Sequence, residues 1–158
     1  MNIIVCEKGK VAKLTSVHNA THVISLLDPG DRPFLHPNHK VIWRSFPCED
    51  QLNENEPNAP TRELVKNLLD FFDELNENSV VIVHCHAGVS RSTAAALALL
   101  VKKTNDIELS IETLKQIRPI ACPNPVISKF ADELLGCDGK LFEASEKLAN
   151  EKIIRMCE

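Results

Sequence analysis

The chain has 158 residues, of which 44% are hydrophobic and 25% charged, a composition typical of one globular domain with a single core. Its formal net charge of −4 at pH 7 argues against a nucleic-acid partner, which would need a basic surface. The apolar runs are all shorter than the roughly 18 residues of a membrane-spanning helix. The N-terminus has no signal-peptide pattern and the six cysteines are scattered, so we expect reduced thiols and a cytoplasmic location.

The first part of the chain alternates short apolar runs with a helical pattern. Residues 3–6 (IIVC) predict a strand, and the spacing of apolar residues in 9–20 predicts a helix. A second strand is predicted at 22–27 (HVISLL), where the turn-forming sequence DPGD ends it. Residues 31–39 read as loop, and 40–46 (KVIWRSF) predict a third strand.

The second part begins with a long polar segment. Residues 47–60 contain three prolines and several acids, which predicts a surface loop, and a loop of this length in a small domain is usually functional. Thr61 is the expected cap of a helix that runs to about residue 75, and residues 80–83 (VVIV) predict a strand buried on both faces. Further helices are predicted at 91–103, 107–117, 125–135 and 140–156.

The alternation of strands and helices predicts an α/β fold. We expect a mostly parallel central sheet of about four to five strands, flanked by helices on both faces. In such sheets, ligands bind at the carboxyl ends of the strands. The residues that follow the predicted strand at 80–83 are therefore the first place to look for a functional site.

The sequence VVIVHCHAGVSRSTAAALALL places Cys85 at the end of that strand and Arg91 at the start of a helix. Small or turn-tolerant residues, including Ala87, Gly88 and Ser90, lie between them and allow the backbone N–H groups to point inward around an anion. The helix N-terminus and the planar guanidinium of Arg91 add positive potential. The pattern predicts a thiolate at the floor of a phosphate-sized cup.

HCHAGVSRST resembles the signature of the cysteine-based protein tyrosine phosphatases, especially the dual-specificity branch and small bacterial relatives. FPCED at 46–50 resembles the segment that carries the general acid of this family. RPIACPNP at 118–125 is similar to the segment after the signature helix, and FADELLGCDGKL at 130–141 to the C-terminal part of some bacterial members. The resemblance covers most of residues 22–141.

The resemblance implies hydrolysis of phosphate monoesters through a phosphocysteine intermediate. Cys85 would be the nucleophile, Asp50 the general acid and base, and Ser92 a hydroxyl donor to the sulfur, while Arg91 holds the phosphate. No metal or other cofactor is expected, because Arg91 and the loop amides supply the positive charge. The residues expected to bind the phosphate are His86, Ala87, Gly88, Val89, Ser90 and Arg91.

Several assignments leave alternatives open. Glu49 and then Glu54 are the alternatives to Asp50 as the general acid, and each of these loop acids is otherwise a solvated side chain. The interpretations of His84 are a metal ligand, for which no zinc-like set of four ligands surrounds it, and a residue beneath the loop that orders it by hydrogen bonds. The second interpretation is the expected one, and whether His84 also lowers the pKa of the thiol is left open. Asn124 either braces the loop, as the resemblance suggests, or is a turn residue between two prolines.

Other residues that contain nitrogen or sulfur ligands each have two interpretations. His86 is either solvated or adds positive charge, and a basic residue here recurs in relatives that accept highly anionic substrates. His36 and His39 hint at a metal, although a polar loop is the simpler interpretation. Cys48 and Cys122 are either packed residues or partners for a protective disulfide with Cys85 under oxidation.

The expected substrate is a phosphorylated protein or peptide that carries phosphotyrosine, with phosphoserine or phosphothreonine as further targets. The alternatives are a catalytically weak phosphate-binding module, a phosphatase of phosphoinositides, and a rhodanese-like sulfur carrier. We expect residues 1–158 to form a single phosphatase domain, with 137–158 a C-terminal helical extension packed on it. The sequence indicates no oligomeric state.

Overall fold

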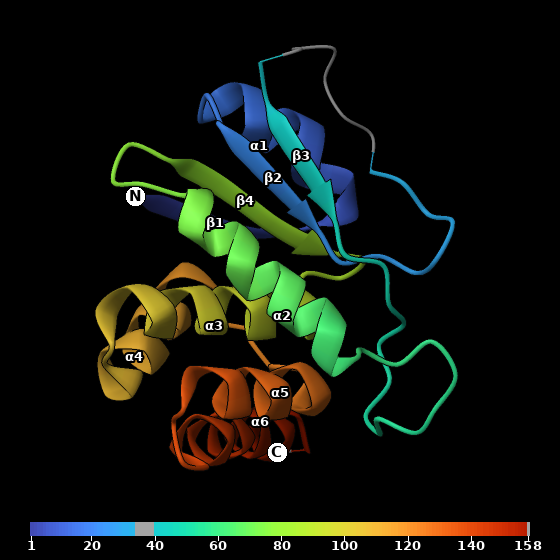
Figure 1. Cartoon of the computed structure of the whole chain (residues 1–158), viewed down its shortest axis with the longest axis vertical. Helices are drawn as coiled ribbons and strands as arrows, with labels where there is room; N and C mark the ends of the chain where they lie inside the picture. Colours follow the sequence, from blue (N-terminus) through green and yellow to red (C-terminus); the bar gives the residue numbers. More distant parts are fainter. Residues whose placement is uncertain (34–39, 158) are drawn as a thin grey trace.

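Within residues 1–33 and 40–157, which the computed structural model describes, four parallel strands form the central sheet. Their order is β1-β4-β2-β3, so β4 lies inside the sheet between β1 and β2 (Figure 1). Cys85 at the end of β4 is in register with Glu7 of β1, and His84 with Ser25 of β2. The strands are β1 (Asn2–Glu7), β2 (His22–Ser25), β3 (Ile42–Ser45) and β4 (Val80–Cys85).

Helices cover both faces of the sheet, as the sequence predicts (Figure 1). One face carries α1 (Val11–Val17), which the short 3₁₀ helix η1 (Lys8–Lys10) precedes. The other face carries the remaining helices. These are α2 (Arg62–Phe71) with the 3₁₀ helix η2 (Phe72–Glu74), α3 (Arg91–Thr104), α4 (Ile107–Ile117), α5 (Pro125–Leu135) and α6 (Lys140–Cys157).

The main core lies between the sheet and α3. Every side chain of α3 from position 91 to position 101 is buried, and the alanines at 94–96 and 98 let the helix axis approach the sheet closely. β4 is buried from Val81 to Cys85 because it lies inside the sheet with helices on both sides. The packing therefore fixes the junction between β4 and α3, where the predicted site lies.

The predicted elements are confirmed, and their ends differ from the predictions by a few residues. The helix predicted at 61–75 is capped by Thr61, whose Oγ1 accepts a hydrogen bond from the Leu64 N–H at 3.1 Å. It leaves α-helical geometry after Phe71 and tightens to a 3₁₀ turn before the extended Leu75. The strand predicted at 80–83 continues to Cys85, since pairing with β1 extends it. Residues 34–39 of the predicted loop lie outside the described residues.

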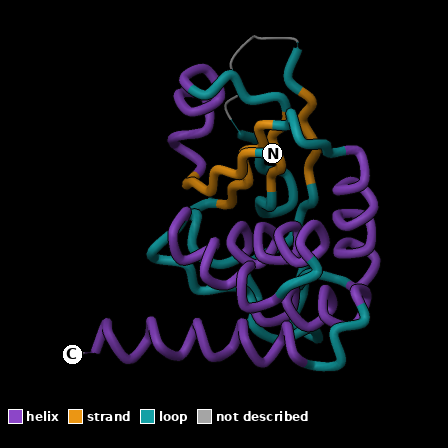
Figure 2. Tube along the Cα trace, turned by 90° about the vertical axis from the view of Figure 1, so that its left-hand side faces the viewer, coloured by secondary structure: helices purple, strands orange, loops and turns teal. Residues whose placement is uncertain are grey.

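The C-terminal helix α6 packs under the helical layer, and its end projects beyond the helices above it (Figure 2). Asp132 on α5 fixes its start, because its carboxylate accepts hydrogen bonds from the N–H groups of Gly139, Leu141 and Phe142. Leu141 and Leu148 are buried, whereas Ile153 and Ile154 nearer the end are exposed. Among the described residues, none of the helices has the length and apolar character needed to cross a bilayer.

Candidate active site

The segment that the sequence singles out lies at the carboxyl edge of the sheet. β4 ends at Cys85, residues 86–90 form a short loop, and α3 begins at Arg91. The segments after β2 and β3 reach the same edge because all the strands run parallel. They bring Asp28 and Asp50 into direct contact with the loop and the start of α3.

The loop is held in place through its carbonyl groups, because the carbonyl of each residue from 85 to 90 accepts a hydrogen bond from the surrounding structure. The C=O and the following N–H of a peptide unit point in opposite directions, so carbonyls fixed outside turn the N–H groups of 86–91 inward. Such a ring of inward donors suits an oxyanion. The His84 ring donates to the carbonyl of residue 85, and the Lys8 N–H donates to that of residue 86. The Arg118 side chain donates to the carbonyls of residues 87 and 88, and the N–H groups of Cys122 and Asn124 donate to those of residues 89 and 90.

Arg118 supports the loop, a role that the sequence pattern does not predict. Its Nε donates to the carbonyl of Gly88 at 2.8 Å, and its Nη2 donates to the carbonyl of Ala87 at 3.2 Å. Glu7 accepts a hydrogen bond from the same Nη2 at 3.4 Å. Arg118 lies within RPIACPNP, but its targets are backbone carbonyls, for which the sequence carries no signal.

Gly88 is required where the loop passes the end of β1. Its φ is +68°, in the left-handed region that side chains disfavour. A Cβ at this position would lie 2.5 Å from the carbonyl carbon of Cys6, well inside van der Waals contact. The loop can therefore fold against β1 only with glycine at this position.

Cys85 lies at the base of the loop and is 2% exposed. Its Sγ accepts a hydrogen bond from the Gly88 N–H at 3.3 Å and lies 3.2 Å from the Ser92 hydroxyl. Both groups can donate hydrogen bonds to an anionic sulfur. The structure thus brings Cys85, Ser92 and the inward-facing loop together, as the sequence predicts.

His84 connects the loop to the sheet through a series of hydrogen bonds. Its Nδ1 lies 3.2 Å from the Cys85 carbonyl, so this nitrogen carries the proton. Its Nε2 then accepts from the Ser25 hydroxyl at 2.6 Å, and that hydroxyl accepts from the Trp43 indole N–H at 2.9 Å. Burial lowers the pKa of His84 to about 4. His84 is therefore neutral at pH 7, and its contacts support a role in ordering the loop rather than in supplying charge.

Arg91 is buried, with its side chain 5% exposed, and two acceptors hold one end of its guanidinium group. Its Nη1 donates to Oδ1 of Asp28 at 2.7 Å and to the carbonyl of Cys48. Among the described residues, Nε of Arg91 is the only buried side-chain nitrogen or oxygen without a hydrogen-bond partner. Asp28 belongs to the DPGD turn, where its charge looked like ordinary turn chemistry in the sequence.

Asp50 is the loop acid that contacts the signature segment. Its Oδ1 accepts hydrogen bonds from the Ser90 hydroxyl at 2.6 Å and from Nδ2 of Asn124 at 2.9 Å. Both bonds fall on one oxygen, so the other oxygen of the carboxyl group is the one placed to carry a proton. Nδ2 of Asn124 also donates to the Gln51 carbonyl at 2.9 Å, and its Oδ1 caps α5.

The two alternative acids point elsewhere. Glu49 accepts hydrogen bonds at 3.0 Å from Gln51 and from Asn58, within its own loop. Glu54 pairs with Lys129 of α5 at 2.7 Å. These contacts shape the loop, and they favour Asp50 among the three candidates.

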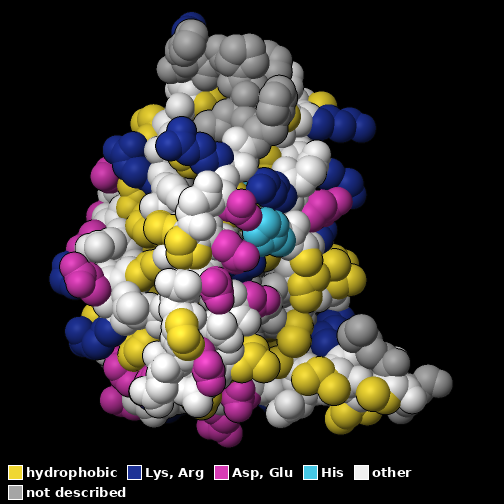
Figure 3. Space-filling model, turned by 90° about the vertical axis from the view of Figure 1, so that its right-hand side faces the viewer, with side chains coloured by type: hydrophobic (Ala, Val, Ile, Leu, Met, Phe, Trp, Pro, Cys, Tyr) yellow, Lys and Arg dark blue, Asp and Glu magenta, His cyan; other side chains and the backbone are white. Residues whose placement is uncertain are grey.

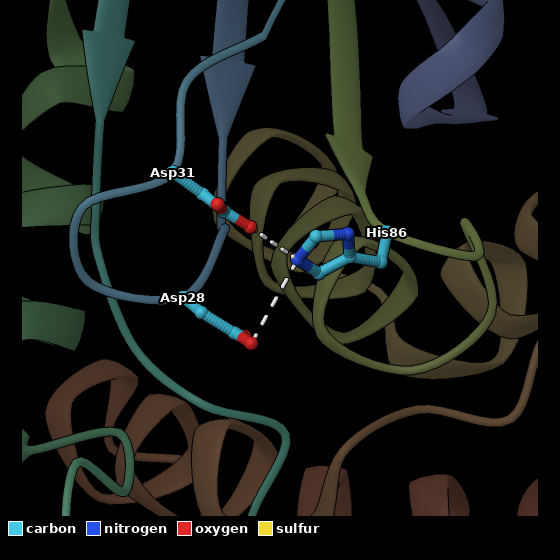
Figure 4. Close-up of side chains that lie close together, drawn as sticks. All are labelled: Asp28, Asp31 and His86. Atoms are coloured by element: carbon cyan, nitrogen blue, oxygen red, sulfur yellow. Dashed lines mark ion pairs between the residues drawn. The ribbon is translucent and has the colours of Figure 1, made fainter.

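His86 lies on the rim of the loop, where two acids face it (Figure 4). Its Nε2 is 2.8 Å from Oδ2 of Asp31 and 3.8 Å from Oδ2 of Asp28. These three side chains hold ligand-type atoms within 4.8 Å of one another, but Asp28 is already paired with the Arg91 cation, which opposes a metal ion there. Acidic side chains also gather around a histidine on the face shown in Figure 3.

The remaining candidate residues are two cysteines near the site and two histidines of the predicted loop. Burial raises the pKa of the Cys48 thiol to about 12, and burial also raises the pKa of Cys122. Both cysteines lie in segments that touch the site, through the Cys48 carbonyl and the Cys122 N–H, and their disulfide with Cys85 stays a prediction. His36 and His39 lie outside the described residues.

Comparison with known proteins gives a consistent match. Residues 3–134 match the family model described as the catalytic domain of dual specificity phosphatases. Human dual specificity protein phosphatase 15 is 32% identical over 111 residues, which are 66% of this chain and 33% of that protein. Human dual specificity protein phosphatase 1 is 36% identical over 94 residues, which are 56% of this chain and 24% of that protein. The chain thus aligns with only a third or less of these relatives.

Solved structures share the fold at low sequence identity. The crystal structure of DUSP15 has a TM-score of 0.64 at 22% identity, with 98% of this chain and 92% of that chain covered. A human tyrosine phosphatase-like serine/threonine/tyrosine-interacting protein has a TM-score of 0.68 at 19% identity, with 86% and 92% covered. PTPMT1 in complex with PI(5)P has a TM-score of 0.58 at 20% identity, with 98% and 94% covered.

Proposed function

The chain belongs to the dual specificity phosphatase family, and on this premise we propose that it is a metal-independent phosphomonoester hydrolase. Its substrates are phosphotyrosine and also phosphoserine or phosphothreonine in proteins. The observation that carries the proposal is the loop 85–90, whose carbonyls are all bonded outward and whose N–H groups therefore face the Cys85 side. This ring and Arg91 supply the positive charge that a metal ion supplies in other phosphatases.

The first step transfers the phosphoryl group to sulfur. The Cys85 thiolate attacks phosphorus while the bond from phosphorus to the leaving oxygen breaks. The loop amides and Arg91 stabilise the charge on the equatorial oxygens. Asp50 donates its proton to the leaving oxygen, which departs as a neutral alcohol or phenol.

The second step regenerates the enzyme. Asp50, now ionised, accepts a proton from a water molecule whose oxygen attacks the phosphocysteine. The bond between phosphorus and sulfur breaks and returns the thiolate of Cys85. The Ser92 hydroxyl, 3.2 Å from the sulfur, donates a hydrogen bond to the thiolate and makes it a better leaving group.

The charges on the rim support a phosphoprotein substrate over a phosphoinositide. The PTPMT1 complex shows that this fold can hold PI(5)P, which makes a lipid phosphate the second candidate. Here His86, the basic rim residue, is paired with Asp31 at 2.8 Å, and Asp28 lies beside it. Two carboxylates at the rim disfavour a headgroup that carries several phosphates, because like charges repel.

The test is release of phosphate from para-nitrophenyl phosphate in the presence of EDTA. We expect turnover by the wild type and only the background rate with Cys85→Ser, whereas activity that needs a divalent cation would reject the mechanism.

Asp50→Asn should lose much more activity on phenyl phosphate than on para-nitrophenyl phosphate, since the better leaving group needs less protonation. Rates on phosphotyrosine, phosphothreonine and phosphoinositide, measured side by side, separate the two substrate candidates. A chain that binds phosphate without turnover would be a phosphate-binding module.

A further inference from the structure

Within the part of the chain that the structure describes, the two hydrogen bonds that hold the guanidinium group of Arg91 both fall on Nη1. We propose that Asp28 is a positioning residue that fixes Nη1 of Arg91, so that the Nε edge of the fork faces the loop and takes the phosphate oxygens. The proposal rests on the proposed function for its consequence in turnover. Its core, the binding of an oxyanion by a pre-oriented arginine, is testable without catalysis.

The hydrogen-bond pattern of Arg91 points to this arrangement. An arginine Nη carries two hydrogens, and both hydrogens of Nη1 have acceptors, Oδ1 of Asp28 at 2.7 Å and the carbonyl of Cys48. These two contacts prevent the guanidinium plane from turning. A carboxylate and an arginine in close contact form one of the stronger types of protein hydrogen bond.

The unpartnered Nε shows which edge of the Arg91 guanidinium group is left for the phosphate. A buried N–H without a partner costs roughly 1–3 kcal/mol, so proteins rarely retain one without a use. Here the group belongs to an arginine at the start of α3, next to the inward-facing amides of the loop. A phosphate in the loop supplies the missing acceptor, and Nε and Nη2 together form an edge that can bind two oxygens.

Backbone hydrogen bonds to the neighbouring strands fix the position of Asp28. Beyond β2, the Leu26 N–H donates to the His84 carbonyl and the Cys48 N–H donates to the Leu27 carbonyl, both at 2.9 Å. These bonds join the chain after β2 to the ends of β4 and β3. The residue that follows them is therefore fixed in position, even though its side chain is 47% exposed.

If Asp28 competed with the phosphate instead of positioning Arg91, its removal would change phosphate affinity in the opposite direction. If the Asp28 carboxylate occupied the place of the phosphate and competed for Arg91, its removal would strengthen oxyanion binding. Removal of any rim carboxylate also strengthens anion binding slightly by reducing repulsion. Asp31 is the matched control for this charge effect, because it faces the same His86 nitrogen, is 40% exposed, and makes its ion pairs with His86 and Lys8 instead of Arg91.

The experiment measures binding of inorganic phosphate to the full chain by calorimetry, together with kcat/KM on para-nitrophenyl phosphate. Asp28→Ala should weaken phosphate binding by about tenfold, the size of a lost charge-assisted hydrogen bond. Asp31→Ala should leave binding unchanged or strengthen it. Asp28→Asn keeps an acceptor for Nη1, so it should fall between the wild type and Asp28→Ala, and it is the variant to measure if Asp28→Ala does not fold.

A second arm tests whether Asp28 acts through Arg91. In the Arg91→Lys background, which lacks the fork, Asp28→Ala should weaken phosphate binding by less than about twofold. Equal losses in both backgrounds, or stronger binding with Asp28→Ala than with Asp31→Ala, would overturn the proposal. If phosphate binds as expected but no ester is hydrolysed, the proposed function fails while the role of Asp28 stands.

Discussion

At the scale of single residues, the loop depends on groups that leave little room for substitution. Gly88 combines a left-handed backbone with contact against the carbonyl group of Cys6. His84, Arg118 and Lys8 fix the carbonyls of the loop from outside. Lys8 acts through its backbone N–H, whereas His84 and Arg118 act through side chains that bind loop carbonyls.

Gly88→Ala should destabilise the protein and abolish turnover. The left-handed conformation costs an alanine roughly 1–2 kcal/mol, and the clash with Cys6 adds a further cost of about 1–3 kcal/mol. Urea unfolding and phosphatase assays check both effects. Gly136→Ala is the control, since Gly136 has a φ of +66° but open space where the Cβ would lie. If the two variants behave alike, the close approach to β1 is not what requires glycine.

His84 should make the stability of the protein depend on pH. Its folded pKa of about 4 lies below the ordinary value of 6.5. The unfolded chain therefore binds a proton more readily, and stability is lost as the pH falls from about 6.5 to about 4. Between pH 7 and pH 5 the expected loss is about 2 kcal/mol.

The check is urea unfolding of the wild type and of His84→Gln at both pH values. The variant has no titrating ring, so its stability should fall by about 2 kcal/mol less over this range, whatever its absolute stability. All other titrating groups are shared by the two proteins. Equal losses would show that His84 is not held neutral.

At the scale of elements, Asn124 connects the start of α5 to the acid loop. Its Oδ1 accepts from the N–H groups of Val126 and Ile127, while its Nδ2 donates to Asp50 and to the Gln51 carbonyl. The cap and the contact with the acid use different atoms of one amide. Substitutions can therefore separate the two roles.

Asn124→Ser should keep most of the stability but lose activity, because a serine hydroxyl caps a helix yet cannot reach Asp50. Asn124→Ala should lose about 1 kcal/mol of stability as well. The activity loss should be about tenfold on phenyl phosphate and smaller on para-nitrophenyl phosphate, as expected for a misplaced general acid. Losses that do not depend on the leaving group would assign Asn124 to the loop alone.

The helices and strands were largely predictable, because the pattern of neighbouring residues determines each of them. The VVIV run and the alanine-rich segment after it carry their own periodicity, so β4 and α3 follow from neighbouring residues. The contact between Asp28 and Arg91 joins residues 63 positions apart, and that between Arg118 and Gly88 joins residues 30 positions apart. Such pairs depend on strand order, which the sequence pattern does not specify.

At the scale of the whole molecule, the C-terminal helix belongs to the same packed body as the sheet. Leu141 and Leu148 of α6 are buried in the core cluster that includes Val83 of β4 and Leu97 of α3. The carboxylate of Asp132 fixes the start of α6 through three backbone N–H groups. The packed core therefore continues beyond residue 134, where the family match ends.

Leu148→Ala should lower the free energy of unfolding by about 2–5 kcal/mol, the usual cost of truncating a buried leucine. Ile154→Ala, on the same helix but 60% exposed, should change it by less than about 0.5 kcal/mol. A single unfolding transition, shifted as a whole by Leu148→Ala, would show that α6 unfolds with the rest of the domain. A separate early transition would instead make α6 an independent appendage.

The chain contains one tryptophan, and a series of hydrogen bonds through Ser25 and His84 links it to the loop. Trp43 on the edge strand β3 donates to Ser25, which reaches the ring of His84 and, through it, the carbonyl of Cys85. The protein thus carries a built-in optical reporter, since all of its indole emission comes from one chromophore coupled to the anion cup. Filling of the cup should register as a spectral change in unlabelled protein, even for ligands that are never turned over.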